Sequence, residues 1–275
     1  MEPIYHGMSR AELDDAYNLT ALMADAPAVL ADFQRRSDRV YQQYPCQRNL
    51  QYGAGLRTTL DYFPSPQPDA PTLIFMHGGF WQSSNKELFA FIVAGLNVRY
   101  QVILAEYTLA PQATMTQIYA EIAELLNWLQ AHRVQLKLQP GQICLSGHSA
   151  GGQLAAMHRN HPLISHAMWL SGLVDLTPIR LCYLNTSLQL TADEVQLFSP
   201  ANSIRKGVPT AVHVGADERS EMLNQSDRYA RLLAAADNPY CYTRLAGCDH
   251  YTLLNGFAAD GALTASLDKL MAKQP

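Results

Sequence analysis

Charged residues are scarce in this sequence. Asp, Glu, Lys and Arg make up 16% of the chain, whereas soluble globular domains usually contain about 25%. The net charge is −4 at pH 7, and the Lys and Arg residues are scattered rather than clustered. This distribution excludes a basic surface of the kind that binds nucleic acid or an anionic membrane.

The sequence also lacks long apolar runs, a signal segment and paired cysteines. No window approaches 18 consecutive apolar residues, and the start MEPIYHGMSRAELDD has no basic stretch followed by an apolar one. A membrane span and a secretory signal are therefore not expected. The five cysteines are irregularly spaced without a CxxC pair, which is typical of reduced thiols rather than of a zinc site. We expect a cytoplasmic protein.

What the chain does contain is a regular alternation of short apolar runs and amphipathic segments. Candidate strands lie at 47–52, 57–62, 72–77, 101–106, 142–147, 166–171, 210–214 and 240–245. Helical spacing of apolar residues predicts helices at 116–130, 150–159, 222–236 and 262–272. Apolar strands separated by such helices indicate an α/β fold, with a mainly parallel central sheet covered by helices on both faces.

Two segments depart from this alternation. Residues 9–44 predict a short helical N-terminal arm, which opens on a capping box formed by Ser9 and Glu12 and contains a second helix at 26–43. Residues 173–208 fit the alternation poorly and are interpreted as an insertion, where a cap over a site could be built. We interpret the whole chain, 1–275, as one domain.

A serine stands in a glycine-rich turn directly after the predicted strand 142–147. The stretch GHSAGG at 147–152 leads from that strand into a predicted helix. Small residues two positions before and after Ser149 leave room for a strained strand-to-helix turn, which presents the hydroxyl at the top of the sheet. Ser149 is therefore a candidate nucleophile. The alternative is an ordinary glycine-rich loop.

A second glycine motif follows the predicted strand 72–77. The sequence there reads HGGFW at 77–81. Successive glycines at Gly78 and Gly79 let the backbone approach a substrate and point N–H groups at it. Together with the amide of Ala150, these groups could hold the oxyanion of a tetrahedral intermediate.

Three side chains beside these motifs are candidates for contact with a substrate. Phe80 and Trp81 follow the glycine pair, and at least one of them is expected to form a pocket wall. His148 adjoins the serine but points in a different direction from it, so we expect this histidine to line or support the site.

A base and an acid should accompany the serine, with the acid before the histidine, at the ends of the last strands. Of the nine histidines, only His250 follows a late strand, and we interpret it as the general base. Asp217 and Glu218 both follow the predicted strand 210–214. Either carboxylate could accept a hydrogen bond from the histidine Nδ1 and stabilise the imidazolium. Spacing alone does not choose between them.

Four motifs together resemble the α/β-hydrolases of the kynurenine formamidase (arylformamidase) group. They are HGGFW at 77–81, AEYTLAP at 105–111, GHSAGG at 147–152 and DHY at 249–251. The likeness covers most of the chain, including LDDAYN at 13–18, and is weakest over 173–208. The HGG and GxSxG motifs are shared with carboxylesterases of the hormone-sensitive-lipase type.

This resemblance implies an α/β-hydrolase fold and a serine hydrolase that acts on a small molecule. The implied substrate is an aryl formamide such as N-formylkynurenine, or a small acyl ester, and neither a metal nor an organic cofactor is needed. The strand-end pattern of the group aligns Glu218 with its acid and leaves Asp217 as the second choice. The alternatives are a general carboxylesterase and a catalytically silent α/β-hydrolase that only binds a ligand. A homodimer is left open.

Overall fold

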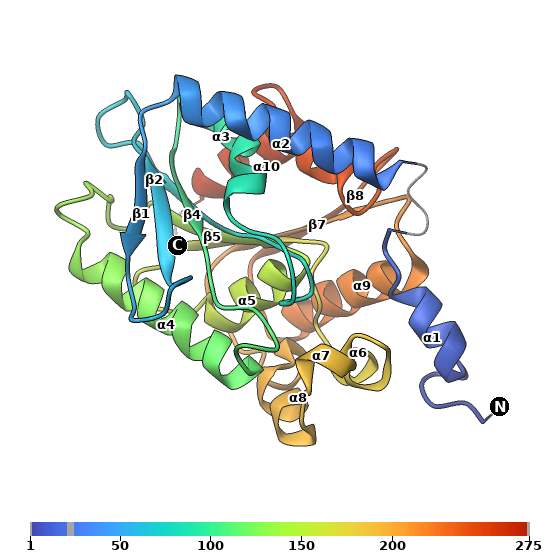
Figure 1. Ribbon diagram of the computed structural model, residues 1–275. Coiled ribbons are helices and arrows are strands. Elements are labelled where there is room, and N and C mark those ends of the chain that lie inside the picture. The colour runs from blue at the N-terminus through green and yellow to red at the C-terminus, as the bar shows by residue number, and fades with distance from the viewer. Residues whose placement is uncertain (1, 21–24, 274–275) are drawn as a thin grey trace.

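The central sheet has eight strands in the order β1-β2-β4-β3-β5-β6-β7-β8 (Figure 1). The computed structural model describes residues 2–20 and 25–273. The strands are β1 (Gln47–Gln51), β2 (Thr59–Phe63), β3 (Thr72–Met76), β4 (Gln101–Ala105), β5 (Ile143–His148), β6 (His166–Leu170), β7 (Thr210–Gly215) and β8 (Tyr240–Leu245). Strand β2 is antiparallel to β1 and β4, and the strands from β4 to β8 are parallel to one another. The predicted, mainly parallel sheet is confirmed.

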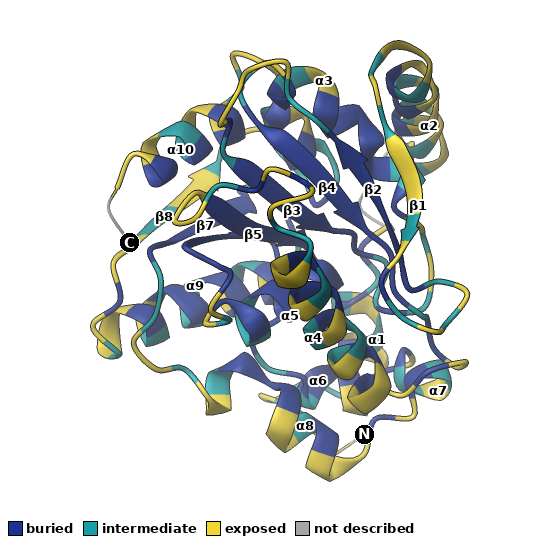
Figure 2. Ribbon diagram, turned by 90° about the vertical axis from the view of Figure 1, so that its left-hand side faces the viewer, coloured by how far each residue is buried: buried dark blue, intermediate teal, exposed yellow. Residues whose placement is uncertain are grey.

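Helices cover both faces of the sheet (Figure 1). One face carries α2 (Ala26–Gln43), α3 (Val93–Leu96) and α10 (Ala262–Met271). The other carries α4 (Met115–Ala131), α5 (Ala150–His158) and α9 (Ser220–Ala235). Strands β2 to β7 are buried along their whole length, which explains why their sequences are apolar runs rather than alternating patterns. Figure 2 shows that exposed residues gather instead at the edge strands β1 and β8.

The N-terminal arm contains two helices, as predicted. The first, α1 (Arg10–Ala16), begins with the expected capping box between Ser9 and Glu12. The second helix, α2, is capped by Asp25, whose side chain accepts a hydrogen bond from the amide of Ala28. Helix α2 packs on a 3-10 helix, η1 (Glu87–Ile92), where the hydroxyl of Ser37 donates to the carbonyl of Leu88 at 2.9 Å. This contact fixes the arm beside the loop that follows β3.

Several short elements were not predicted. Residues 87–96 form η1 and α3; their sequence, ELFAFIVAGL, is apolar almost throughout and so has no helical periodicity to detect. The segment 173–208 contains α6 (Thr177–Leu181), α7 (Asn185–Leu188), α8 (Ala192–Phe198) and the 3-10 helix η2 (Pro200–Asn202). A last 3-10 helix, η3 (Thr252–Phe257), precedes α10. Within the described ranges, no helix is both long and apolar enough to cross a membrane.

Candidate active site

The candidate nucleophile lies in a strained turn between β5 and α5. Ser149 has φ 55° and ψ −117°, a backbone conformation that costs free energy for a residue with a side chain. A Cβ on Gly147 would lie 2.1 Å from the carbonyl oxygen of Gly151, and a Cβ on Gly151 would lie 2.1 Å from that of Met76. The residues two positions before and two positions after Ser149 must therefore both be glycine, as the sequence indicated. The turn places Ser149 at the carboxyl end of the parallel strands.

The structure pairs Glu218, and not Asp217, with His250. Oε2 of Glu218 lies 2.7 Å from Nδ1 of His250, and both side chains are buried. The other carboxylate oxygen, Oε1, accepts hydrogen bonds from the amide of Gly215 at 2.9 Å and from the hydroxyl of Ser171. Asp217 is exposed. The carboxylate of Glu218 is thus held by two donors while its second oxygen faces the imidazole, as an orienting acid requires.

Ser171 is a site residue that the sequence analysis missed. It directly follows β6 and has φ 46°, so its side chain lies at the carboxyl edge of the sheet with the other polar groups of the site. Its place after a predicted strand was the available signal, since residues at that edge gather around one site in open α/β sheets.

The HGG loop approaches the serine closely. A Cβ on Gly78 would lie 2.9 Å from the Cβ of Ser149. Gly79 has φ 105°, and a Cβ there would lie 2.3 Å from the backbone oxygen of Ser83, so this position has no room for a side chain. Among the described residues, none accepts a hydrogen bond from the amide of Gly79 or from that of Ala150. These amides lie beside the serine and remain available to an oxygen of a bound molecule.

A buried network of charged groups supports this loop. His77 places Nε2 2.9 Å from Oε1 of Glu106 and Nδ1 2.7 Å from the carbonyl oxygen of Gly78. Both partners are hydrogen-bond acceptors, so each ring nitrogen of His77 faces an oxygen to which it can donate. Burial alone would raise the pKa of Glu106, but the hydrogen bond from His77 and the charges of His77 and Arg57 lower it below its ordinary value. His77 therefore polarises the Gly78 peptide group, whose amide hydrogen belongs to Gly79.

His148 ties the serine turn to the His250 loop. Its Nε2 lies 2.7 Å from the backbone oxygen of His250, to which it donates, and its Nδ1 has no partner among the described residues. Burial lowers the pKa of His148 well below its ordinary value, and the nearby His250 lowers it further. His148 is therefore neutral, and its hydrogen bond holds the backbone of His250 in place.

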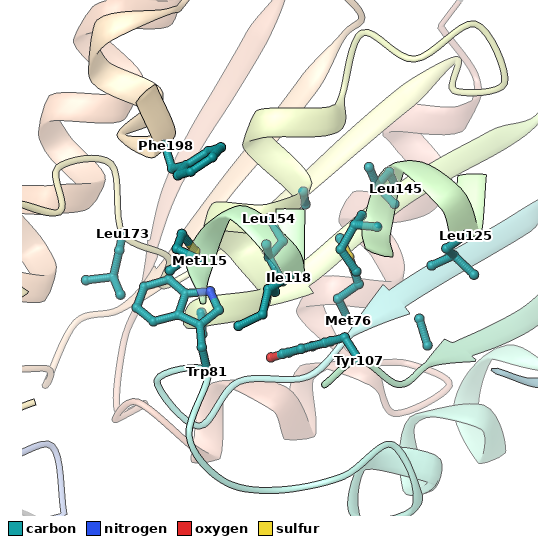
Figure 3. Close-up of a cluster of buried hydrophobic side chains, with 14 of the residues drawn as sticks. Met76, Trp81, Tyr107, Met115, Ile118, Leu125, Leu145, Leu154, Leu173 and Phe198 are labelled. Carbon is teal, nitrogen blue, oxygen red and sulfur yellow. The ribbon is translucent and has the colours of Figure 1, made fainter. Parts of the chain in front are cut away.

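The two aromatic residues of HGGFW lie in different places. Phe80 lines the cavity with Ser149. Trp81 is fully buried in the core, where Figure 3 shows its indole among Met115, Leu173 and neighbouring side chains. The positive φ values of Phe80 and Trp81 reverse the chain direction there, so successive side chains do not face the same space. The structure therefore places Trp81 away from the expected substrate wall.

A cavity of about 240 Å³ joins the candidate residues. Ser149, His250, His148 and the glycine pair all lie in its wall. Leu19 and Leu30 of the N-terminal arm also line it, whereas none of its described lining residues comes from 173–208. The arm, rather than the predicted insertion, therefore contributes to the wall of this cavity. No sequence pattern in the arm had indicated a role in the site.

Comparisons with known proteins agree with this arrangement. A family model described as BD-FAE matches residues 60–162. Kynurenine formamidase of Danio rerio is 27% identical over 242 residues, which span 82% of this chain and 80% of the relative. Kynurenine formamidase of Drosophila melanogaster is 29% identical over 233 residues, which span 77% of each chain.

A solved structure supports the same fold. The thermostable carboxylesterase EstE1, cloned from a metagenomic library, has a TM-score of 0.71 with this chain at 19% identity. The match covers 89% of this chain and 95% of EstE1. The expected α/β-hydrolase fold is confirmed.

Proposed function

We propose, from the premise that the chain is an α/β-hydrolase of the arylformamidase and esterase group, that it is a serine hydrolase working through an acyl-enzyme. One observation carries this proposal. His250, which is paired with Glu218, shares a cavity with Ser149, at a point where two backbone amides have no acceptor among the described residues. A nucleophile, a base with its orienting acid, and an oxyanion site are the parts that acyl transfer needs.

The proposed reaction has two steps. His250 takes the proton of the Ser149 hydroxyl as the oxygen attacks the acyl carbon, and the amides of Gly78, Gly79 and Ala150 stabilise the oxyanion. His250 then gives that proton to the departing amine or alcohol, which leaves the acyl group on Ser149. In the second step the same imidazole activates water, which releases the acid and restores the serine. Neither step needs a metal or an organic cofactor.

The proposed substrates are small aryl formamides and small acyl esters. The two formamidase relatives support N-formylkynurenine as the reference substrate, which would give kynurenine and formate. The apolar side chains around the cavity favour, as a second candidate, a carboxylesterase for short acyl or aryl esters. We also propose a cytoplasmic location, which the free state of all five cysteines supports.

The purified protein is expected to release aniline from formanilide and phenol from phenyl acetate. A fluorophosphonate probe should label the peptide that contains Ser149, because the probe reacts with activated serines. Peptide mapping by mass spectrometry identifies the labelled residue. Absence of both hydrolysis and labelling would reject the enzyme and favour a silent binding protein.

Replacement of Glu106 by glutamine is expected to lower kcat for phenyl acetate by about 10- to 100-fold with little change in KM. The variant removes the carboxylate charge that faces His77, so His77 polarises the Gly78 peptide group less strongly and the Gly79 amide becomes a weaker donor to the oxyanion. Loss of a whole donor costs about 10²- to 10³-fold. Steady-state kinetics measure the effect. Glu124→Gln, at an exposed position, is the matched control and should retain normal kinetics. An effect on KM alone would contradict a role in oxyanion stabilisation.

A further inference from the structure

Apolar side chains form much of the cavity wall around Ser149. Leu19 and Leu30 come from the N-terminal arm, Leu88 and Phe89 from η1, and Phe80 and Tyr251 from the loops after β3 and β8. The arm and η1 are fixed to each other by the contact of the Phe33 ring with the tilted ring of Phe91, whose centroids lie 4.2 Å apart. The wall is therefore part of the packed fold.

The polar groups of the wall are neutral or belong to the reaction. They are the hydroxyls of Ser83, Ser84, Ser149 and Tyr251 and the histidines already described. In the described part of the chain, no Asp, Glu, Lys or Arg lines the cavity. Residues 21–24, which fall outside that part, read ALMA and contain no ionisable side chain.

Arg57 and Lys86 lie beside residues of this wall, and both cations are already paired. Arg57 donates to the backbone oxygen of Ser84 at 2.8 Å, but the same Nη2 binds Glu106 at 2.7 Å. Lys86 is buried and places its Nζ 2.5 Å from Oε1 of Glu87 and 3.5 Å from Oδ1 of Asp61. Turning either cation toward a substrate anion would take a positive charge away from a buried carboxylate, Glu106 or Asp61, which is costly.

An ionised substrate group would lose hydration in this cavity and gain no ion pair. The amino acid end of N-formylkynurenine carries both a carboxylate and an ammonium group, whereas the reacting aryl formamide is neutral. We propose that the site takes uncharged aryl formamides and uncharged aryl or short-chain esters, and selects against substrates with an ionised amino acid end. This proposal rests on the proposed function and specifies its substrate class.

A matched pair of formamides tests the proposal. 2-Formamidoacetophenone has the aryl formamide and the ortho ketone of N-formylkynurenine but lacks the amino acid end. Its kcat/KM is expected to exceed that of N-formylkynurenine by at least about tenfold, equivalent to about 1.4 kcal/mol. Equal values, or a preference for N-formylkynurenine, would overturn the proposal and leave the hydrolase intact. Failure to hydrolyse either formamide or phenyl acetate would reject the proposed function and this inference with it.

A charge placed in the wall provides the second test. Leu30 is only partly buried, so a lysine there keeps access to water and can face a substrate carboxylate. In Leu30→Lys, kcat/KM for N-formylkynurenine divided by kcat/KM for 2-formamidoacetophenone is expected to rise by about fivefold. This change corresponds to the free energy of a partly exposed ion pair. Leu30→Met, which is similar in size and uncharged, should leave the ratio unchanged. An unchanged ratio in a folded Leu30→Lys variant would count against the proposal.

Discussion

Replacement of Ser149 by alanine is expected to lower kcat/KM for phenyl acetate by roughly 10⁴- to 10⁶-fold, the range seen when a serine hydrolase loses its nucleophile. The loss follows from the removal of the attacking oxygen, because no other hydroxyl is presented by the strained turn at the carboxyl end of β5. Residual turnover would come from the oxyanion amides and binding alone. The measurement is steady-state hydrolysis, with fluorophosphonate labelling of the same preparations.

Ser146 offers a matched control for that experiment. It lies three positions earlier, is fully buried in β5, and its hydroxyl has no hydrogen-bond partner among the described residues. Ser146→Ala removes a hydroxyl from the strand that leads into the turn and leaves Ser149 in place, so it should retain both hydrolysis and labelling. Comparable losses in both variants would point to damaged packing rather than to a missing nucleophile.

Replacement of Glu218 by glutamine is expected to lower kcat by roughly 10³- to 10⁴-fold, as in serine hydrolases whose triad acid becomes an amide. Glutamine keeps the size of the side chain. Only its oxygen can accept hydrogen bonds, however, whereas both oxygens of the Glu218 carboxylate accept them. Ser171 and the Gly215 amide both donate to Oε1, which leaves the amide group of a glutamine facing His250. His250 would then hold its proton on Nε2 and could not accept one from serine.

Asp217→Asn is the control for the acid. Because Asp217 is exposed, the kcat of Asp217→Asn should stay within about twofold of that of the unmodified protein, which is the usual result for a surface substitution. A larger loss in Asp217→Asn than in Glu218→Gln would reject the assignment of Glu218. The pH dependence of kcat, measured for both variants, separates a changed base from a changed fold.

The sequence predicted the sheet and the serine turn because both depend on local patterns. Runs of strand length were found at all eight strands, and Gly147 is required by a contact within the turn itself, with the carbonyl oxygen of Gly151. The choice between Asp217 and Glu218 is different in kind. It depends on how the turn after β7 directs two adjacent side chains, and the bond from the Gly215 amide back to Glu218 is visible only in the structure.

Contacts between distant segments were beyond reach of sequence patterns. Leu19 and Leu30 line the cavity because the arm packs on η1, an element without helical periodicity in its sequence. Ser171 meets Glu218 across 47 positions of the chain, and no spacing rule connects them. Trp81 follows a motif that suggested a pocket wall, yet the backbone reversal at Phe80 and Trp81 sends it into the core.

Helix α5 begins without a side-chain cap, since the Ser149 hydroxyl accepts no hydrogen bond from its first turn. Helices elsewhere in the chain, such as α1 and α4, close that end with a capping box, and losing such a cap usually costs about 1 kcal/mol. An anion bound at the open end of α5 would recover part of that free energy. The acid released by hydrolysis is such an anion. The attraction is confined to the oxyanion amides, because the rest of the cavity wall offers an ionised group no partner. The released acid is therefore expected to act as a weak product inhibitor that also raises thermal stability, and both effects would come from the uncapped first turn of α5.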